Sequence, residues 1–205
     1  MTQAHRYLEN GLTCPKLIVA GQQNQGRGRY GKHWVSPKGN LYCSYVCPIL
    51  GTPQQMSVIF GVVLARVLTR LLGPIVAIKY PNDILIQGKK IAGILVEPHD
   101  AFFVIGMGVN IAFSPSNLTY ETTCFSKYRS DITLGCFVHY ILREVARSLN
   151  DCDFREICNE WRGFCGHMNQ FVHLSDGRSG IFWDITEEGL PKFADFDCTV
   201  NNSTL

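Results

Sequence analysis

Two arginines stand between closely spaced glycines in the segment GQQNQGRGRYGKHW, and their guanidinium groups indicate an anion-binding loop. The pattern is Gly26-Arg27-Gly28-Arg29-x-Gly31, in which Tyr30 is the spacer residue. Glycine leaves the backbone open to close approach, and each guanidinium can fork onto carboxylate or phosphate oxygens. Like charges in a mobile loop repel each other, so we expect the loop to become ordered when an anionic ligand arrives. Taken alone, the segment fits a solvated surface loop equally well.

The glycine spacing also matches nucleotide-binding motifs, but the residues around it argue against them. A dinucleotide fingerprint needs a strand before the glycines and a helix that opens at the last one. The segment after Gly31 instead contains Ser36-Pro37 and Gly39-Asn40, which end or prevent helices. A Walker loop needs Ser or Thr after its lysine, where this chain has His33. A hydride-transferring oxidoreductase is therefore rejected.

A lysine, an amide and a carboxylate form a second polar group, in the segment KYPNDILIQGKKIAGILVE. Pro81-Asn82-Asp83 is a polar turn before an apolar stretch, and Lys90 begins the next apolar stretch. The intervening turn, Gln87–Lys90, contains a glycine and predicts a hairpin that brings Lys90 back toward Asn82 and Asp83. Ordinary hairpin chemistry explains these residues on their own. Together with the arginine loop, they predict a site for an anionic ligand at one end of a sheet.

Five motifs, which follow one another in the family order, resemble those of the biotin–protein ligases. They are Gln23-x-x-Gly26-Arg27-Gly28-Arg29, Trp34-x-Ser36-Pro37-x-Gly39-Asn40-Leu41, Lys79-Tyr80-Pro81-Asn82-Asp83, Lys89-Lys90-Ile91-Ala92-Gly93-Ile94-Leu95-Val96-Glu97 and Gly106-Met107-Gly108-Val109-Asn110. The resemblance covers nearly the whole chain. It implies an α+β fold, with a mixed-sheet biotin/lipoate ligase-like catalytic domain at 1–165. A small, abbreviated SH3-like β domain at 166–205 is implied to follow.

The resemblance implies an ATP-dependent ligase that forms a C–N bond. Such an enzyme activates biotin with ATP and Mg²⁺ to biotinyl-5′-AMP, then moves biotin to one lysine of a biotin carboxyl carrier domain of acetyl-CoA carboxylase. In the first step two anions meet while charge builds on phosphoryl oxygens, so fixed positive groups are the main catalytic tool. By resemblance, Lys90 contacts both the carboxylate and the phosphate. Arg27 and Arg29 lie in the loop that closes over the adenylate and excludes water.

The resemblance also distributes roles over the other site residues. The catalytic set is Lys90, Arg27 and Asp83. Asp83 orients the incoming carrier lysine or assists its deprotonation. The biotin-binding set, in which Gln23, Thr2 and Gln3 hold the ureido ring, is Thr2, Gln3, Gln23, Arg27, Gly28, Arg29, Lys90 and Gly93. The ATP-binding set, in which the tryptophan lies near the adenine, is Arg27, Arg29, Trp34, Asn82, Lys90 and Asn110. No residue is assigned to a metal.

The sequence departs from the family pattern in three places. Met1 stands where the family has Ser and the strand expected before it is missing, so the N-terminal wall of the biotin pocket is not transferred. Tyr80 replaces a tryptophan. The C-terminal domain is short, so contacts made there by relatives to ATP or carrier are not transferred either. No helix-turn-helix precedes Thr2, and with a net charge of +2 we expect no binding to nucleic acid and no repressor role.

The elements that position these residues follow from the hydrophobic pattern. Thr52-Pro53-Gln54-Gln55 is a capping box that begins a helix, which Gly73-Pro74 ends. Further helices are expected over Gln3–Asn10, from Leu134, and after Asp151. The helix from Leu134 is expected to bury one face, formed by Phe137, Ile141, Leu142, Val145 and Leu149. Strands are expected at Leu17–Ala20, Leu41–Cys47, Val76–Tyr80, Ile84–Ile86, Ile91–Glu97 and Phe102–Val109.

Beyond Gly166 the pattern changes to a small β-meander. Its strands are expected at Gln170–Leu174, Gly180–Ile185 and Leu190–Phe193, with turns at Ser175-Asp176-Gly177 and Glu187-Glu188-Gly189. About 40 residues are too few to be trusted to fold alone. We therefore expect the meander to pack on the main domain.

Composition favours a cytoplasmic protein. The longest apolar stretch, Val58–Leu72, is broken by Arg66 and Arg70, so we expect no membrane span, and the N-terminal residues show no signal-peptide pattern. Nine cysteines without a C-x-x-C motif indicate free thiols in a reducing compartment. One group of side chains could be considered as zinc ligands, namely Cys152, Cys158, Cys165 and His167. The spacing of these residues fits no common zinc site. A monomer or a homodimer is expected.

Two other functions remain possible from the sequence. A lipoate or octanoate transferase of the same superfamily has a similar lysine, but such enzymes lack the Gly-Arg-Gly-Arg loop. A non-catalytic biotin-binding module would bind the neutral ureido ring without needing Lys90, Arg27 or Asn82. Each possibility predicts a different ligand, so competition between ligands distinguishes them.

Overall fold

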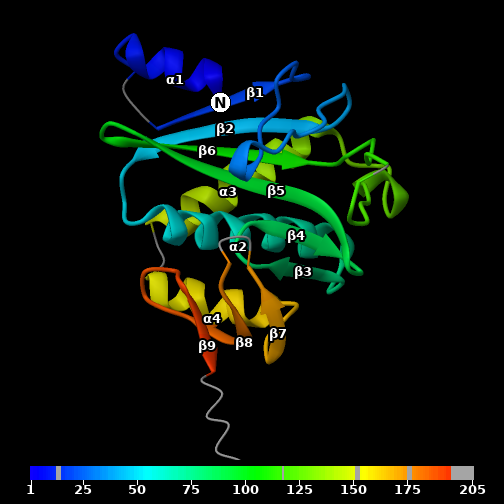
Figure 1. Ribbon diagram of the computed structural model, residues 1–205. Helices are drawn as coiled ribbons and strands as arrows, with labels where there is room; N and C mark the ends of the chain where they lie inside the picture. Colours follow the sequence, from blue (N-terminus) through cyan, green and yellow to red (C-terminus); the bar gives the residue numbers. More distant parts are fainter. Residues whose placement is uncertain (13–14, 117, 151–152, 175–176, 195–205) are drawn as a thin grey trace, which may run out of the picture.

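The computed structural model describes residues 1–12, 15–116, 118–150, 153–174 and 177–194. In this part of the chain a six-stranded sheet and a three-stranded sheet pack with four α-helices (Figure 1). All neighbouring strands of both sheets run antiparallel. The expected α+β architecture with a small C-terminal sheet is confirmed. The large sheet was expected to be mixed, but all its described strand pairs are antiparallel.

The elements lie within two or three residues of their predicted positions. The large sheet has the order β1 (Lys16–Ala20), β2 (Leu41–Pro48), β6 (Phe102–Val109), β5 (Lys89–His99), β4 (Asp83–Ile86) and β3 (Val76–Lys79). The small sheet has the order β7 (Gln170–His173), β8 (Ser179–Ile185) and β9 (Pro191–Ala194). The helices are α1 (Thr2–Glu9), α2 (Pro53–Leu72), α3 (Leu134–Asn150) and α4 (Phe154–Phe164). Short 3₁₀ turns lie at Arg29–Gly31 and Phe125–Lys127.

Helix α2 is the central core helix, and its capping box forms as predicted. The Thr52 hydroxyl accepts a hydrogen bond from the Gln55 amide at 3.1 Å, and the Gln55 side chain accepts one from the Thr52 amide at 2.7 Å. The helix is long and apolar enough to cross a membrane, but it is largely buried between the sheet and the helices α3 and α4. Of its two arginines, Arg66 is accommodated because the Glu160 carboxylate accepts hydrogen bonds from two of its N–H groups.

Helix α3 buries a narrower face than predicted. Phe137, Ile141 and Val145 are buried, but Leu142 is 41% exposed, so its assignment to the core face was wrong. Positions 137, 141 and 145 follow one another at intervals of four and form a single stripe. Leu142 comes one residue after Ile141 and is therefore rotated by about 100° away from that stripe.

The two faces of the large sheet have different coverings. Helices α2 and α3 cover one face, where the main core lies. On the other face α1 packs over β1, β2 and β6, and its Ala4 contacts Val46 and Val104 in a second, small core (Figure 1). Because side chains alternate along a strand, Gly93 of β5 and Gly108 of β6 lie on this second face. These two residues are directly paired, and they leave a shallow floor beside α1.

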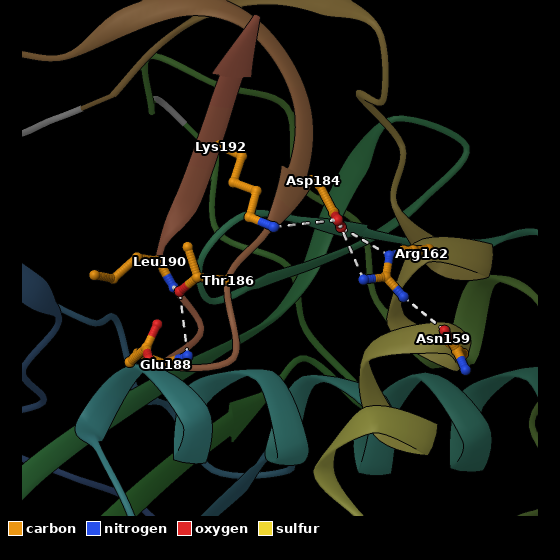
Figure 2. Close-up of polar contacts among 7 residues, drawn as sticks. All are labelled: Asn159, Arg162, Asp184, Thr186, Glu188, Leu190 and Lys192. Carbon is orange, nitrogen blue, oxygen red and sulfur yellow. Dashed lines mark hydrogen bonds and ion pairs between the residues drawn. The ribbon is translucent and has the colours of Figure 1, made fainter.

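The small sheet is attached to α4 by a bidentate ion pair (Figure 2). Asp184 of β8 accepts hydrogen bonds from Arg162 at 2.7 and 3.2 Å, and the Lys192 ammonium lies 3.9 Å from the same carboxylate. Burial acts to raise the pKa of the Asp184 carboxyl, but the hydrogen bonds from Arg162 and the nearby positive charges hold this pKa below its usual range. Beneath this pair, Phe182 packs on Trp161 with ring centres 6.0 Å apart. The expectation that the meander packs on the main body is thus confirmed, while a domain boundary at 165/166 stays a prediction.

A second attachment joins the turn after β8 to the start of α2. Thr186 organises this turn, because its hydroxyl accepts hydrogen bonds from the amides of Glu188 and Leu190 (Figure 2). The Thr52 hydroxyl donates to the Glu188 carbonyl at 2.8 Å, and Tyr80 donates to the Gly189 carbonyl at 3.2 Å. The residues that cap α2 therefore also bind the C-terminal sheet.

Gly189 makes the closest contact of this junction, which gives a testable expectation for stability. Its φ is +79°, and a Cβ would lie 2.9 Å from the Gln54 carbonyl carbon. Gly177 is the matched control, with φ +91° and no atom within 4 Å of its Cβ position. Each alanine variant loses about 1–2 kcal/mol of folding stability, because alanine must adopt a left-handed backbone conformation. We expect Gly189→Ala to lose about 1–3 kcal/mol more than Gly177→Ala, because it overpacks the contact with α2.

Urea unfolding of the two variants and the wild-type chain measures this difference. Equal losses of unfolding free energy in the two variants would show that Gly189 does not pack against α2 as closely as the structure describes.

Candidate active site

A cleft of about 1120 Å³ lies over the uncovered part of the large sheet. It is bordered by α1, the glycine loop, the turn before β4, strands β5 and β6, and the edge of the small sheet. Almost all the predicted site residues line it, namely Thr2, Gln3, Gln23, Arg27, Gly28, Arg29, Trp34, Asn82, Asp83, Lys90 and Gly93. The arginine loop and the lysine hairpin thus meet in one place, as predicted.

The hairpin of β4 and β5 places Lys90 against Asp83. Its turn is only two residues, Gln87 and Gly88, with φ of +50° and +79°, so it is shorter than the predicted four residues. Positive φ at both positions is typical of the type I′ turns that join antiparallel strands. The Lys90 ammonium lies 2.7 Å from the Asp83 carboxylate, and the lysine side chain is only 14% exposed. A largely buried cation with one carboxylate partner is suited to binding a further anion.

Trp34 lies flat on the glycine floor of the cleft. A Cβ on Gly93 would be 3.0 Å from the Trp34 ring, and one on Gly108 would be 2.6 Å from it. The indole can therefore reach the sheet only because both positions are glycine. Its ring centre is 5.3 Å from the Lys90 ammonium. Among the described residues the buried indole N–H has no hydrogen-bond acceptor.

The glycine loop is a tight, irregular hairpin. The Trp34 amide donates to the Gly26 carbonyl at 2.9 Å, and the Gly28 amide donates to the Lys32 carbonyl at 2.7 Å. A Cβ on Gly26 would overlap the Trp34 carbonyl. Every residue of this loop is described, and no α-helix opens at Gly31. The rejection of a dinucleotide fingerprint is confirmed, because that motif requires a helix N-terminus at this point.

The two arginines of the loop have different partners. Arg27 Nη2 lies 3.1 Å from the Glu97 carboxylate at the far end of β5, which also accepts a hydrogen bond from His5 at 2.8 Å. Arg29 donates to the Asn82 side-chain oxygen at 3.2 Å, which links the loop to the turn before β4. The two guanidiniums are thus held apart, one on each side of the cleft. The ordering of the loop by an anion stays a prediction.

Gln23 and Asn110 are the two predicted side chains whose placement is most informative. Ser36 donates a hydrogen bond to the Gln23 carbonyl oxygen at 3.1 Å, which leaves the Gln23 amide N–H groups for other partners. Asn110 is only 2% exposed and donates to the Thr123 carbonyl at 3.1 Å. It borders a separate small cavity with Trp34 and Lys90 and does not line the main cleft. Its contact with ATP therefore stays a prediction.

Several residues of the cleft were missed by the sequence-based predictions. They are Lys32, Lys79, Tyr120, His173 and Arg178, together with Glu97 beside the cleft. Lys79 and Glu97 lie within recognised motifs, and Lys32 follows the arginine loop, so their positions could have drawn attention to them. Tyr120 comes from an irregular loop, while His173 and Arg178 belong to the small sheet and the turn before β8. Nothing in the sequence pattern indicates that these last three residues approach Lys90.

Among the described cysteines, Cys43 lines this cleft, and it does not supply a nucleophile. Burial raises the pKa of the Cys43 thiol to about 12, so the thiol is neutral at physiological pH. Burial also raises the pKa of Cys165 to about 11, and burial followed by the Lys79 charge lowers that of the neighbouring His167 to about 4. The prediction of free thiols is confirmed for the described cysteines, which are Cys43, Cys47, Cys124, Cys136, Cys158 and Cys165. Cys152 of the zinc group considered above lies outside the described residues.

The contact between Trp34 and Gly108 gives an expectation for a Gly108→Ala variant. The added methyl must displace the indole, so we expect a loss of about 1–3 kcal/mol in stability and a red-shifted tryptophan emission. In a Trp183→Phe background the remaining tryptophans are Trp34 and the fully buried Trp161, so a red shift reports on the displaced Trp34 indole. Gly21→Ala is the control, since nothing lies within 4 Å of its Cβ position. An unchanged spectrum in Gly108→Ala would contradict the placement of the indole.

The chain resembles known proteins in both sequence and structure. The model of the Biotin/lipoate A/B protein ligase family matches residues 2–110. The bifunctional ligase/repressor BirA of Escherichia coli is 40% identical over 114 residues, which are 51% of this chain and 34% of that protein. The biotin–[acetyl-CoA-carboxylase] ligase of Paracoccus denitrificans is 37% identical over 118 residues, which are 53% of this chain and 49% of that protein. The chain thus matches half or less of the length of these curated relatives.

Solved structures show the same fold. The biotin protein ligase from Aquifex aeolicus in complex with biotin and ATP superposes with a TM-score of 0.80 and 23% identity. The superposition covers 90% of this chain and 84% of that protein. The biotin protein ligase from Leishmania major in complex with biotinyl-5-AMP gives a TM-score of 0.74 at 21% identity, over 90% of this chain and 94% of that one.

Proposed function

The chain belongs to the Biotin/lipoate A/B protein ligase family, and we propose that it is an ATP-dependent biotin–protein ligase. In the proposed first step the biotin carboxylate attacks the α-phosphorus of ATP, pyrophosphate leaves, and biotinyl-5′-AMP forms. In the second step a lysine amine of the carrier attacks the activated carbonyl, AMP leaves, and an amide bond remains. ATP enters as its Mg²⁺ complex, so Mg²⁺ belongs to the substrate.

The observation that carries this proposal is the convergence of Lys90, Arg27 and Arg29 on one cleft. A carboxylate and a triphosphate repel each other, and the transition state places further charge on the phosphoryl oxygens. Cations that are already held in place lower this barrier without reorganisation at the moment of reaction. Lys90 is the central cation, because its side chain is largely buried in the cleft.

Asp83 has a different part in each proposed step. Its ion pair with Lys90 keeps the lysine in the cleft before the substrates bind. The anionic substrates compete for the ammonium, and the Asp83 carboxylate is then available to orient the carrier lysine or to assist its deprotonation. Once the amine is neutral and close to the mixed anhydride, transfer requires chiefly proximity.

The neutral and charged parts of the cleft match the two ends of the proposed intermediate. We assign the biotin end to Thr2, Gln3, Gln23, Gly28 and Gly93, with Gln23 donating its free amide N–H groups to the ureido ring. We assign the nucleotide end to Arg29, Trp34 and Asn82 in the cleft and to Asn110, which borders the neighbouring small cavity. Arg27 and Lys90 lie between the two ends, where the carboxylate and the α-phosphate join.

We also propose the partner and setting of this reaction. The carrier is a biotin carboxyl carrier domain of acetyl-CoA carboxylase, an enzyme that appears in the names of the Paracoccus denitrificans and Mycobacterium tuberculosis relatives. The reaction takes place in the cytoplasm, with the chain as monomer or homodimer and with no role for membrane or nucleic acid. A lipoate or octanoate transferase and a non-catalytic biotin-binding module are less favoured, because neither explains two arginines and a lysine around one cleft.

The proposed function predicts a covalent change in a carrier domain. We expect the chain, with biotin, Mg-ATP and the carrier, to add the mass of one biotinyl group to the carrier in intact mass spectrometry. Lys90→Ala should lower the rate by at least about 100-fold, because it removes the fixed cation at the reacting phosphate. Lys89→Ala is the matched control, since that neighbouring side chain is 45% exposed and pairs with Glu121.

Modification of the carrier by lipoate in place of biotin would replace the ligase proposal with the lipoate alternative. Biotin binding without any mass gain, in folded wild-type chain, would support the binding module.

A further inference from the structure

A segment outside the recognised motifs, residues 118–123, packs directly on Lys90. The Lys90 amide donates to the Glu121 carbonyl at 2.9 Å, and the Thr123 amide donates to the Lys90 carbonyl at 3.0 Å. These two bonds form a short parallel bridge between Lys90 and Thr122. Main-chain pairing of this kind fixes the position of the segment relative to β5. It thereby places the side chain of Tyr120 beside the lysine.

The Tyr120 ring contacts the Lys90 ammonium from within this segment. The ammonium lies 5.2 Å from the centre of the Tyr120 ring and 5.3 Å from the Trp34 ring. Both distances fall within the range of cation–π attraction. Burial and the Asp83 charge raise the pKa of the Tyr120 phenol, while the Lys32 charge acts in the opposite direction. The phenol is therefore neutral at physiological pH, and its ring adds no second negative charge beside Asp83.

The ring and the carboxylate hold Lys90 in chemically different ways. Asp83 attracts the ammonium but also offsets its positive charge, so the carboxylate competes with an incoming anion. An aromatic ring attracts the same ammonium through its quadrupole and leaves the full charge available. When anionic substrates draw Lys90 away from Asp83, the rings are the contacts that keep the flexible side chain in the cleft.

We propose that Tyr120 is a positioning residue for Lys90, which holds the ammonium at the reacting phosphate while the ion pair with Asp83 is broken. This inference rests on the ligase function proposed above. Trp34 provides a second ring, but Trp34 also lies on the glycine floor and is assigned to the nucleotide. Tyr120 is 45% exposed and has no such role, so its contribution can be tested separately.

The kinetic test compares Tyr120→Phe with Tyr120→Leu in the full chain. The reaction followed is the formation of biotinyl-adenylate, measured as pyrophosphate release from biotin and Mg-ATP. We expect Tyr120→Phe, which keeps the ring, to stay within about twofold of wild type, and Tyr120→Leu to lower kcat by about tenfold. KM for biotin should change less than kcat, since the ring acts on Lys90. Tyr7→Leu is the matched control, because Tyr7 is 43% exposed and does not line the cleft.

Equal kcat values for the Leu and Phe variants would overturn the proposal. An NMR measurement tests the same proposal without depending on the activity or the stability of the Tyr120→Leu variant. In chain labelled with ¹³C-lysine, the Lys90 ε-CH₂ signal, assigned with Lys90→Arg, is expected upfield in wild type and Tyr120→Phe through ring-current shielding. Replacement of Tyr120 by Leu or by Met should move this signal downfield, and an unmoved signal would overturn the contact. Absence of pyrophosphate release from folded wild-type chain would instead overturn the ligase function, and the NMR comparison would still decide whether Tyr120 holds Lys90.

Discussion

The ion pair of Lys90 and Asp83 is the interaction on which the cleft is organised. A largely buried ammonium requires a partner, because its desolvation is costly. Here the partner comes from the same hairpin, and a two-residue turn between β4 and β5 brings the two charges to 2.7 Å. The glycines of β5 and β6 lie next to this pair and admit an indole against the sheet. The arginine loop borders the same cleft above this ion pair. Three cations therefore line one concave surface at separate positions.

The elements and the pairing of the two charged segments could be predicted from the sequence because their causes are local. A capping box, a helical stripe and a glycine turn each depend on a few neighbouring residues. The roles of the loop and of Lys90 come from the resemblance of the five motifs, and they stay predictions. Leu142 was misplaced because the width of a buried stripe depends on what packs against the helix, which no local pattern records.

The remaining parts of the site depend on contacts between distant segments. Glu97 pairs with Arg27 across 70 positions of the chain, and Tyr120 reaches Lys90 through an irregular loop. Asn110 follows a strand inside a recognised motif, yet its amide is turned toward the Thr123 carbonyl and away from the main cleft. Such placements follow from the closure of loops over the sheet, and neither hydrophobic periodicity nor residue spacing determines it.

The attachment of the small sheet has a consequence for how this part of the chain can diverge. Its acceptors toward Thr52, Gln55 and Tyr80 are the main-chain carbonyls of residues 187–189. Every residue type supplies such a carbonyl, so drift of the side chains in this turn leaves the docking bonds intact as long as the path of the backbone is kept. The path itself is constrained, because Gly189 leaves no room for a side chain against α2. We therefore expect related proteins to preserve the shape of this turn more strictly than its residue identities, with two exceptions: Gly189, and Thr186, whose hydroxyl organises the turn.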